Sequence, residues 1–380
     1  MTPSQPALFT PAFLGLTLAE LAYFTAFGLT VYTLPLFVTG PVGSDTAGAG
    51  LAFGVFAVAA LVCRPYAGRL SDQWGRKPFL VGGSVLCALS LVMLGSVDSF
   101  AVVLLLRAVQ GVGEAAFFVA GFAMLADIAP AERLGEALSY NSLGLYLGLV
   151  LGPAVGEAVM RWSGFQAVWW AGAALCVVAA VVVSRLPEAP RIEAGEPGAL
   201  IHWAAIPVSL GFCAVLAAAG GFLAFAALRA EQVGSSPTSL VLVLYGAVVV
   251  VCRIAFAKMT DRFPSLPLAG VSLAVITAGL AAMAASTHPV GLLLGATLLA
   301  AGVAFATPAF FAAIFATAGP RQRGAAAGTA SIFMDLGLGL GPVLLGFVAA
   351  ATGIPWAFAA AAGLAAAGAL WTAYLTRQPR

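Results

Sequence analysis

Five ionisable side chains lie inside long apolar stretches of this 380-residue sequence: Glu20, Arg107, Glu114, Glu157 and Asp335. A charge at the centre of a membrane helix costs at least roughly 2.5–3.5 kcal/mol, so each of these residues is a candidate for function. A carboxylate in such a place can take up a proton from one side and release it to the other. Counting along a helix places Glu20, Glu114 and Asp335 near the middle of a bilayer, and Glu157 near its outer surface.

Three polar residues of one apolar stretch have helical spacing. Arg107, Gln110 and Glu114 follow one another at intervals of three and four residues, so they share one face of a helix. We predict a polar stripe in which Glu114, together with Glu20, couples proton movement to a substrate, with Asp335 as a third candidate. The alternative is a structural ion pair, in which Arg107 neutralises Glu114 or Glu20.

Aromatic residues lie on or beside the helix face that carries Glu20. They are Tyr23, Phe24 and Phe27. Aromatic side chains at this spacing either pack helices together or form the wall of a cavity for an apolar or amphipathic substrate. The sequence leaves both interpretations open.

The composition indicates the elements that must position these residues. The chain is 62% hydrophobic and 8% charged, whereas soluble chains carry roughly 25% charged residues. Apolar runs of this length are typical of membrane-spanning helices. The first run is too long for the core of a signal peptide and is expected to remain as the first span.

The apolar runs and the breakers between them predict twelve transmembrane helices. Their expected ranges are 10–38, 47–67, 78–97, 100–126, 135–160, 165–186, 202–228, 237–258, 265–286, 289–317, 324–351 and 354–376. The predicted fold class is therefore an all-α membrane protein with two pseudo-symmetric six-helix bundles. We expect the bundles to comprise residues 1–186 and 201–380, joined by a charged, proline-rich linker at 187–200.

The distribution of Lys and Arg predicts the orientation in the membrane. Fourteen of the 17 Lys and Arg residues fall on the side of the two termini, and two fall on the opposite side. Positive residues are retained in cytoplasmic loops. Both termini and the linker are therefore predicted to be cytoplasmic.

A compact charged stretch, Gly68–Pro78, points to an internal duplication. The segment Cys63–Asp72 reappears in weakened form as Cys252–Asp261, half a chain length later. Gly148–Pro153 and Gly337–Pro342 repeat at the same separation. Two six-span halves with the same orientation are expected to be related by an axis along the membrane normal and to meet at a central substrate site.

These motifs resemble those of the major facilitator superfamily over essentially the whole chain. Gly68–Pro78 is similar to the family's signature between the second and third spans, and Arg107–Gly113 resembles the fourth-span motif of proton-coupled members. Gly148–Gly156 resembles the fifth-span motif of antiporters, although Glu157 stands where the family often has a second glycine.

Within the family, Arg64-Pro65 and Pro35 are most similar to bacterial sugar-efflux or drug-efflux permeases. The resemblance implies a multi-pass protein of the bacterial inner or plasma membrane that functions as a monomer.

The resemblance also implies that the charged stretch latches the outward-facing state. The glycines are expected to allow a tight turn and close helix approach, and Arg76 can pair with a carboxylate such as Asp127. The alternative is a simple positive anchor at the membrane surface. The residues expected to form the latch are Gly68, Arg69, Asp72, Gly75, Arg76, Lys77, Asp127, Arg133, Lys258 and Asp261.

Glycines and prolines predict where helices pack closely. Small residues four apart let helix backbones approach each other, and prolines add kinks. We expect packing at these positions, either alone or together with gating. The residues are Gly148, Gly152, Pro153, Gly156, Gly337, Gly341 and Pro342.

Several chemistries find no support in the sequence. The five cysteines and the isolated His202 and His288 lack metal-ligand spacing, and neither a phosphate loop nor a dinucleotide motif is present. A membrane-embedded enzyme would need clustered carboxylates or histidine pairs near one surface. We therefore expect no enzymatic activity, no cofactor, no metal and no nucleic-acid partner.

The function predicted on these grounds is secondary active transport. A small organic molecule such as a drug, a sugar or a metabolite would be exported in exchange for protons by alternating access. The expected partners are this substrate, protons and the lipid bilayer. The alternative is a nutrient importer or uniporter with the same fold.

Overall fold

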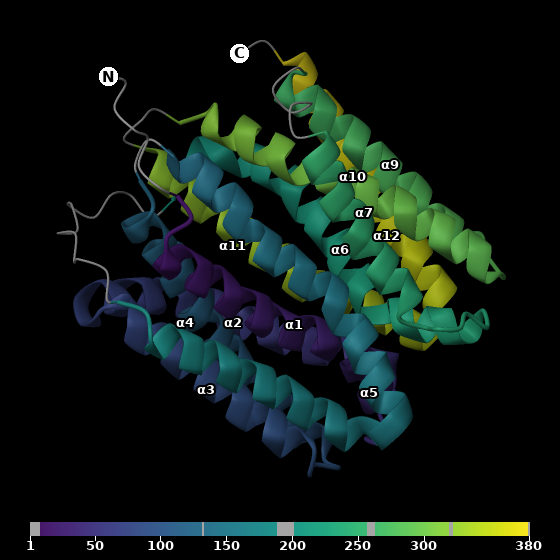
Figure 1. The fold of residues 1–380 in the computed structure, drawn as a ribbon. Coiled ribbons are helices and arrows are strands. Elements are labelled where there is room, and N and C mark those ends of the chain that lie inside the picture. The colour runs from purple at the N-terminus through teal and green to yellow at the C-terminus, as the bar shows by residue number, and fades with distance from the viewer. Residues whose placement is uncertain (1–7, 131–132, 188–200, 257–262, 319–321, 379–380) are drawn as a thin grey trace.

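The structure is a computed structural model that describes residues 8–130, 133–187, 201–256, 263–318 and 322–378. Long α-helices make up most of the described chain (Figure 1). They are α1 (Pro11–Thr39), α2 (Thr46–Trp74), α3 (Arg76–Leu94), α4 (Phe100–Ile128), α5 (Leu134–Ser184), α6 (Ile206–Gln232), α7 (Leu240–Ala255), α9 (Ser265–Ala285), α10 (Pro289–Phe315), α11 (Arg323–Thr352) and α12 (Ile354–Arg377), with a 3₁₀ turn, η2, at Trp203–Ala205.

Local sequence sets several helix boundaries. Asp45 caps α2, because its side chain accepts a hydrogen bond from the backbone N–H of Gly48 at 2.8 Å. Helix α5 is two helices joined at Gly164, whose φ of 77° is outside the helical region. Gly353, with a φ of 98°, separates α11 from α12 in the same way. With α5 divided, the described residues form twelve helical segments.

The surface and the helix lengths suit a bilayer. Ten helical stretches of the described residues are long and apolar enough to cross a membrane, and α7 is a shorter apolar helix of 16 residues. Leu105, Leu344 and Leu370 are among many large apolar side chains exposed on the outside of the molecule. The predicted all-α membrane fold is confirmed.

The helix boundaries repeat at the separation seen in the sequence. Residues 76, 100 and 134 begin α3, α4 and α5, and residues 265, 289 and 323 begin α9, α10 and α11. Each of these pairs is as far apart along the chain as Cys63 is from Cys252. The breaks at Gly164 and Gly353 have the same separation. The duplication therefore extends to the backbone of both halves.

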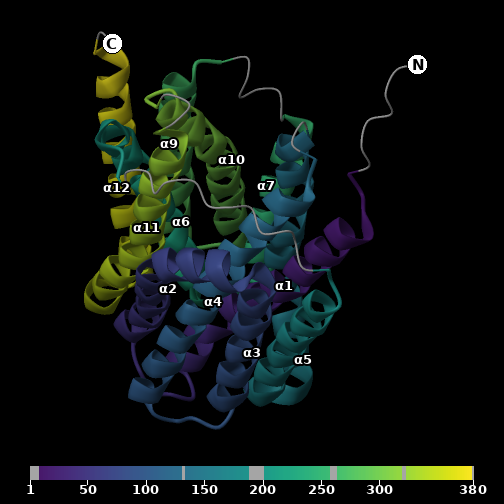
Figure 2. The ribbon, with the colours of Figure 1, turned by 90° about the vertical axis from the view of Figure 1, so that its left-hand side faces the viewer.

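Helices α1 to α5 form one group and α6 to α12 the other; in Figure 2, α2, α3, α4 and the later part of α5 lie below, and α9, α10 and α12 lie mostly above. We call them the first and second halves. Within the halves α1 packs along α5 and α9 along α10, while α2 packs along α11, and α5 against α7, between the halves. The start of α1 and the end of α12 lie toward one end of the helices (Figure 1). We call this the near end and the opposite one the far end.

The charged stretch differs from the expected turn. Helix α2 continues to Trp74, so Gly68 lies within a helix, and the turn before α3 depends on Gly75 alone, with a φ of 97°. A Cβ atom at Gly68 would meet Val119 at an ordinary 3.6 Å. The expectation that Gly68 serves a tight turn is therefore wrong. The expected linker lies, apart from Pro187, outside the described residues.

Candidate functional site

An arginine between two carboxylates joins the halves near the middle of the helices. Arg64 of α2 places its Nη2 atom 3.2 Å from Oε1 of Glu114 on α4. Its Nη1 atom lies 3.1 Å from Oδ2 of Asp335 on α11, in the second half. Glu114 and Asp335 are buried, and the guanidinium also lies 4.8 Å from the ring centre of Phe118. We call Arg64, Glu114 and Asp335 the two-carboxylate site.

The charges of this site do not cancel when both acids are ionised. One cation faces two carboxylates, which leaves one negative charge in excess. Such an excess is costly in an apolar interior, and a single bound proton removes it. Oδ2 of Asp335 is within ion-pair distance of Arg64, yet among the described residues it has no hydrogen-bond partner. The three side chains therefore place unequal numbers of positive and negative charges at a contact between the halves.

A second arginine occupies the equivalent position in the second half. Arg253 of α7 is the counterpart of Arg64 in the repeat, and its guanidinium carbon lies 4.3 Å from the ring centre of Tyr146 on α5. Tyr146 is the equivalent of Asp335, and Val303 is the equivalent of Glu114. The structure records no ion pair of Arg253 with another described residue. We call Arg253 and Tyr146 the arginine–tyrosine site.

Glu20 lies apart from both sites, inside the first half. Asn141 of α5 donates a hydrogen bond of 2.6 Å from Nδ2 to Oε2 of Glu20, and its Oδ1 accepts one of 3.0 Å from Thr17. Gly121 of α4 faces the other carboxylate oxygen. The structure thus brings Glu114 and Asp335 together, while Glu20 has an amide partner of its own.

Arg107 is buried and turned toward the backbone of α2. Its Nε atom donates to the carbonyl oxygen of Ala52 at 3.0 Å, and Nη1 donates to Oε1 of Gln110. The ring of Phe56 lies 4.4 Å from the guanidinium. No ion pair of Arg107 with Glu114 or Glu20 occurs in the structure, because Glu114 pairs with Arg64 instead.

A small cavity, lined mostly by apolar atoms, lies beside Arg107 in the interior of the first half. Its volume is about 20 Å³, and Arg107, Gln110, Tyr23 and Thr30 are among its lining residues. The Nε2 atom of Gln110 is buried without a hydrogen-bond partner among the described residues. A cavity of this size has room for about one water molecule.

The aromatic residues beside Glu20 make packing contacts within the first half. Tyr23 stacks on Phe117 with ring centres 3.9 Å apart, and its hydroxyl lies 3.0 Å from the sulfur of Cys87. Phe24 meets the edges of Phe117 and Phe118, and Phe27 lies 5.5 Å from Phe56. Phe118 in turn contacts Arg64, so this cluster supports the two-carboxylate site from one side.

The charged stretch forms ion pairs at the near end of the first half. Arg76, the first residue of α3, lies 3.2 Å from Oδ2 of Asp127 on α4 and also pairs with Asp72 on α2. Arg69 is exposed, Lys77 follows Arg76, and Arg133 directly precedes α5. Lys258 and Asp261 lie outside the described residues.

A carboxylate joins the halves at the far end. Glu157 of α5 accepts hydrogen bonds from the backbone N–H groups of Thr238 and Ser239, at 3.1 and 2.7 Å, where α7 begins. Arg161 pairs with the same carboxylate at 2.7 Å, and Tyr32 shares a hydrogen bond of 2.7 Å with Thr238. A carboxylate is favourable at a helix N-terminus, where backbone N–H groups lack partners.

The repeated glycines pack helices within each half. A Cβ atom at Gly148 would lie 2.7 Å from backbone atoms of α1, and one at Gly337 would lie 2.6 Å from the carbonyl oxygen of Cys213 on α6. Gly152 and Gly341 are similarly close to α1 and α6, and a Cβ atom at Gly156 would make a tight contact of 3.3 Å with Thr33 on α1. Pro153 and Pro342 lie inside α5 and α11. A different glycine, Gly50 of α2, faces Pro342 and Gly346 of α11 across the halves.

The sequence alone did not identify the partners that complete these sites. The sequence related Arg64 to the efflux-like motif and to the orientation of the chain, and it placed Glu157 near the outer surface, but it predicted a partner for neither residue. The repeated pairs Cys63-Arg64 and Cys252-Arg253 were a usable signal for the two arginines. Asn141, in contrast, shares no motif with Glu20, and only the packing of α1 on α5 brings them together.

Comparisons with known proteins agree with this geometry. Residues 16–225 and 208–380 match the sequence profile of the Major Facilitator Superfamily. The chain is 28% identical over 379 residues to the uncharacterized MFS-type transporter YhhS of Escherichia coli K12, with 96% of this chain and 92% of YhhS covered. It is 32% identical over 368 residues to the uncharacterized MFS-type transporter BURPS1106A_3201 of Burkholderia pseudomallei, with 93% and 89% covered.

Two solved structures share the fold. One is a bacterial homologue of the human lysosomal transporter Spinster, with a TM-score of 0.83, 18% identity and 98% of each chain covered. The other is the nucleoside transporter NupG, with a TM-score of 0.78, 16% identity, and 97% of this chain and 100% of NupG covered. The twelve helical segments, the repeated halves and the match along almost the whole sequence lead to one conclusion: the chain is a multi-pass membrane transporter that belongs to the major facilitator superfamily.

Proposed function

We propose that this protein exports a small organic molecule in exchange for protons across a bacterial inner membrane, with its near end in the cytoplasm. The observation that carries the proposal is the two-carboxylate site, in which Arg64 and Glu114 of the first half meet Asp335 of the second. The excess of Lys and Arg at the near end supports the orientation.

The site links proton occupancy to the relative position of the halves. While both acids are ionised, Arg64 attracts Asp335 across the interface between α2 and α11. Protonation of either acid weakens this attraction, because a neutral carboxyl binds a guanidinium less strongly than a carboxylate does. The halves then separate at lower cost. Proton uptake on one side and release on the other would drive the exchange by population shift.

The contacts at the far end support a conformation closed to the outside. There Glu157 binds the start of α7, and Gly50 lies against α11. Opening toward the outside would require these contacts to break. The ion pair of Arg76 with Asp127 lies within the first half and is a candidate latch for the opposite state.

Import by the same fold is the second candidate. The observation that favours export is the run Gly148–Gly156, which packs α5 on α1 as the antiporter-like motif requires. Direction and coupling can be measured together. Purified protein in liposomes would be given a panel of drugs, sugars and metabolites, with and without an imposed pH gradient.

The matched variants are Glu114→Gln and Asp335→Asn. We expect each to abolish substrate-driven proton movement while retaining exchange of substrate for substrate. Asp98→Asn, a change of an exposed carboxylate in a far-end loop, is the control and should behave as the unmodified protein. Glu20→Gln tests the other buried acid in the same assay. Proton movement that persists in both Glu114→Gln and Asp335→Asn would rule out the two-carboxylate site as the coupling site.

A further inference from the structure

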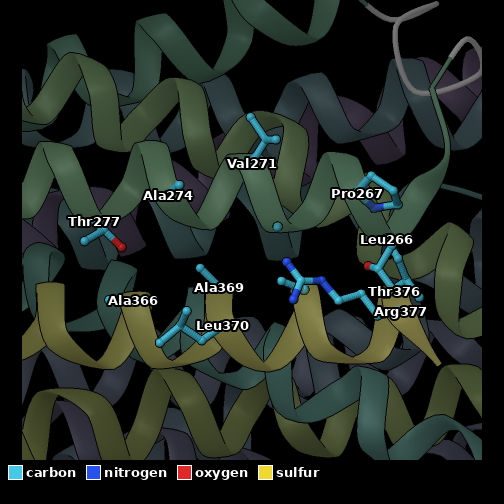
Figure 3. A pocket seen from close by; sticks show the side chains of 12 residues that line it. Leu266, Pro267, Val271, Ala274, Thr277, Ala366, Ala369, Leu370, Thr376 and Arg377 are labelled. Atoms are coloured by element: carbon cyan, nitrogen blue, oxygen red, sulfur yellow. The ribbon is translucent and has the colours of Figure 1, made fainter.

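A long apolar groove lies between α9 and α12 on the outside of the second half. Its volume is about 640 Å³. Small residues leave the space between the two helices open: Ala274, Ala366 and Ala369, labelled in Figure 3, and Gly270, which also lines the groove. Val271 and Leu370 are exposed along its edges, so the groove faces the lipid.

The length of the groove matches one leaflet of a bilayer. It runs from Leu266, in the first turn of α9, to Thr277, three turns further along the same helix. Eleven helical steps correspond to about 16 Å, and half the hydrocarbon thickness of a bilayer is about 15 Å. The groove thus extends from the near-end surface to about the middle of the membrane, which is the depth that one acyl chain occupies.

A cation lies at the near-end mouth of the groove. Arg377 is the last residue of α12 and is one of the lining residues. Figure 3 shows its guanidinium between α9 and α12, over the groove. The structure records no hydrogen bond or ion pair of Arg377 with another described residue. Thr376, beside it, donates its hydroxyl hydrogen to the carbonyl oxygen of Thr372 at 2.8 Å, so the positive charge at this mouth comes from Arg377.

The first half does not repeat this groove. Val81, Val85 and Val177 stand at the positions equivalent to Gly270, Ala274 and Ala366, so branched side chains occupy the equivalent positions. The sequence equivalent of Arg377 is Glu188, which lies outside the described residues. At these equivalent positions, the second half combines small residues along the groove with a cation at its mouth, whereas the first half has valines and Glu188.

We propose that the groove binds an anionic phospholipid of the cytoplasmic leaflet, with one acyl chain along Gly270 and Ala274 and the phosphate at Arg377. The near-end orientation proposed above places Arg377 at the level of lipid headgroups. Apolar burial along the groove holds the chain, and the guanidinium favours an anionic headgroup over a zwitterionic one.

Native mass spectrometry of the full-length protein tests this proposal with two lipids that share the same chains, palmitoyl-oleoyl phosphatidylglycerol and palmitoyl-oleoyl phosphatidylcholine. We expect one phosphatidylglycerol to be retained about fivefold more tightly than phosphatidylcholine. Arg377→Gln should remove this preference and retain binding of either lipid. Gly270→Leu should remove the bound lipid, because a Cβ atom there meets only Thr372, at 3.7 Å or more, and the rest of the side chain fills the groove.

Two control variants match these changes. Arg185→Gln alters an exposed arginine beyond the last turn of α5, and Gly363→Leu alters an α12 glycine at which an added Cβ atom would have no neighbour within 4 Å. Both should bind lipid as the unmodified protein does. Equal retention of the two lipids would overturn the proposal, as would a phosphatidylglycerol that remains bound in Gly270→Leu. A second copy of the chain in the groove would appear as a dimer and would overturn it too.

Discussion

Arg64 and Arg253 occupy equivalent positions in the two halves, but their surroundings differ. Arg64 meets Glu114 and Asp335, whereas Arg253 lies on the ring of Tyr146. Both arginines lie at an interface between the halves. Among the described residues, carboxylates pair with Arg64 and not with Arg253. The two interfaces therefore differ in charge, and the symmetry of the fold does not extend to its chemistry.

Other equivalent positions show the same divergence. Asp127, which pairs with Arg76, corresponds to Ala316, and Arg76 itself corresponds to Ser265. At the far end Glu157 binds the start of α7, whereas its equivalent, Gly346, allows α2 to approach α11. At each of these positions the first half has a charged side chain, whereas the second half has a small uncharged residue.

The largest expected effect distinguishes the two arginines. Arg64→Gln leaves two buried carboxylates without their cation, and breaking a buried ion pair in this way costs about 3–5 kcal/mol. Arg253→Gln removes a contact between a cation and a ring, which is worth about 0.5–2 kcal/mol. Unfolding in detergent would measure both. Equal destabilisation would show that the two sites do not differ as their partners suggest.

The next effect concerns the far end. Glu157→Gln removes the charge that binds the N-terminus of α7, an interaction worth up to about 2 kcal/mol. We expect the population open to the outside to rise by up to about thirtyfold. Spin labels at Ser96 and Thr287, in far-end loops of the two halves, would report the separation. Arg161→Gln, which leaves the bonds to Thr238 and Ser239 in place, should have a smaller effect.

The near-end pair should have a moderate effect on turnover. Asp127→Asn weakens a partly buried ion pair worth about 1 kcal/mol, so transport should fall about fivefold while substrate binding is retained. Ala316→Asp places an acid at the equivalent position of the second half. The equivalent of Arg76 there is Ser265, which carries no charge. It should leave transport unchanged. An equal loss of binding and transport in Asp127→Asn would argue against a latch.

The smallest effect is expected at the arginine–tyrosine site. Tyr146→Phe keeps the ring beneath Arg253 and removes only the hydroxyl, so the rate of transport should change by less than about twofold. Substrate-driven proton movement should persist. Its complete loss would mean that both interfaces, rather than one, take part in coupling.

Features that repeat or follow local rules were predictable from the sequence. The apolar runs indicated the spans, and the constant separation of the repeated motifs indicated the duplicated halves. The helical character of Gly68–Trp74 was not predicted, because charges and a glycine at a span end are also typical of a turn. Within Gly68–Pro78, only Gly75 has a positive φ.

The sequence predicted the two acids of the candidate site, but it did not predict which cation they pair with. Glu114 and Asp335 stood out as charges within apolar runs, since any such charge needs a partner. Their common partner was not evident, because Arg64 lies near the end of its predicted span and Arg107 offered a closer cation along the chain. The rotation of α2 about its own axis turns Arg64 toward both acids. No sequence pattern predicts that rotation.

The interface between α2 and α11 contains two kinds of contact, and the approach of Gly50 to α11 is the uncharged one. A Cβ atom at Gly50 would lie 3.2 Å from Gly346, so backbone meets backbone where α2 and α11 cross at the far end. This backbone contact carries no charge, whereas deeper along the same two helices Arg64 of α2 pairs with Asp335 of α11. A change of charge at the centre of the α2–α11 interface would therefore leave the uncharged backbone contact at its far end unaltered.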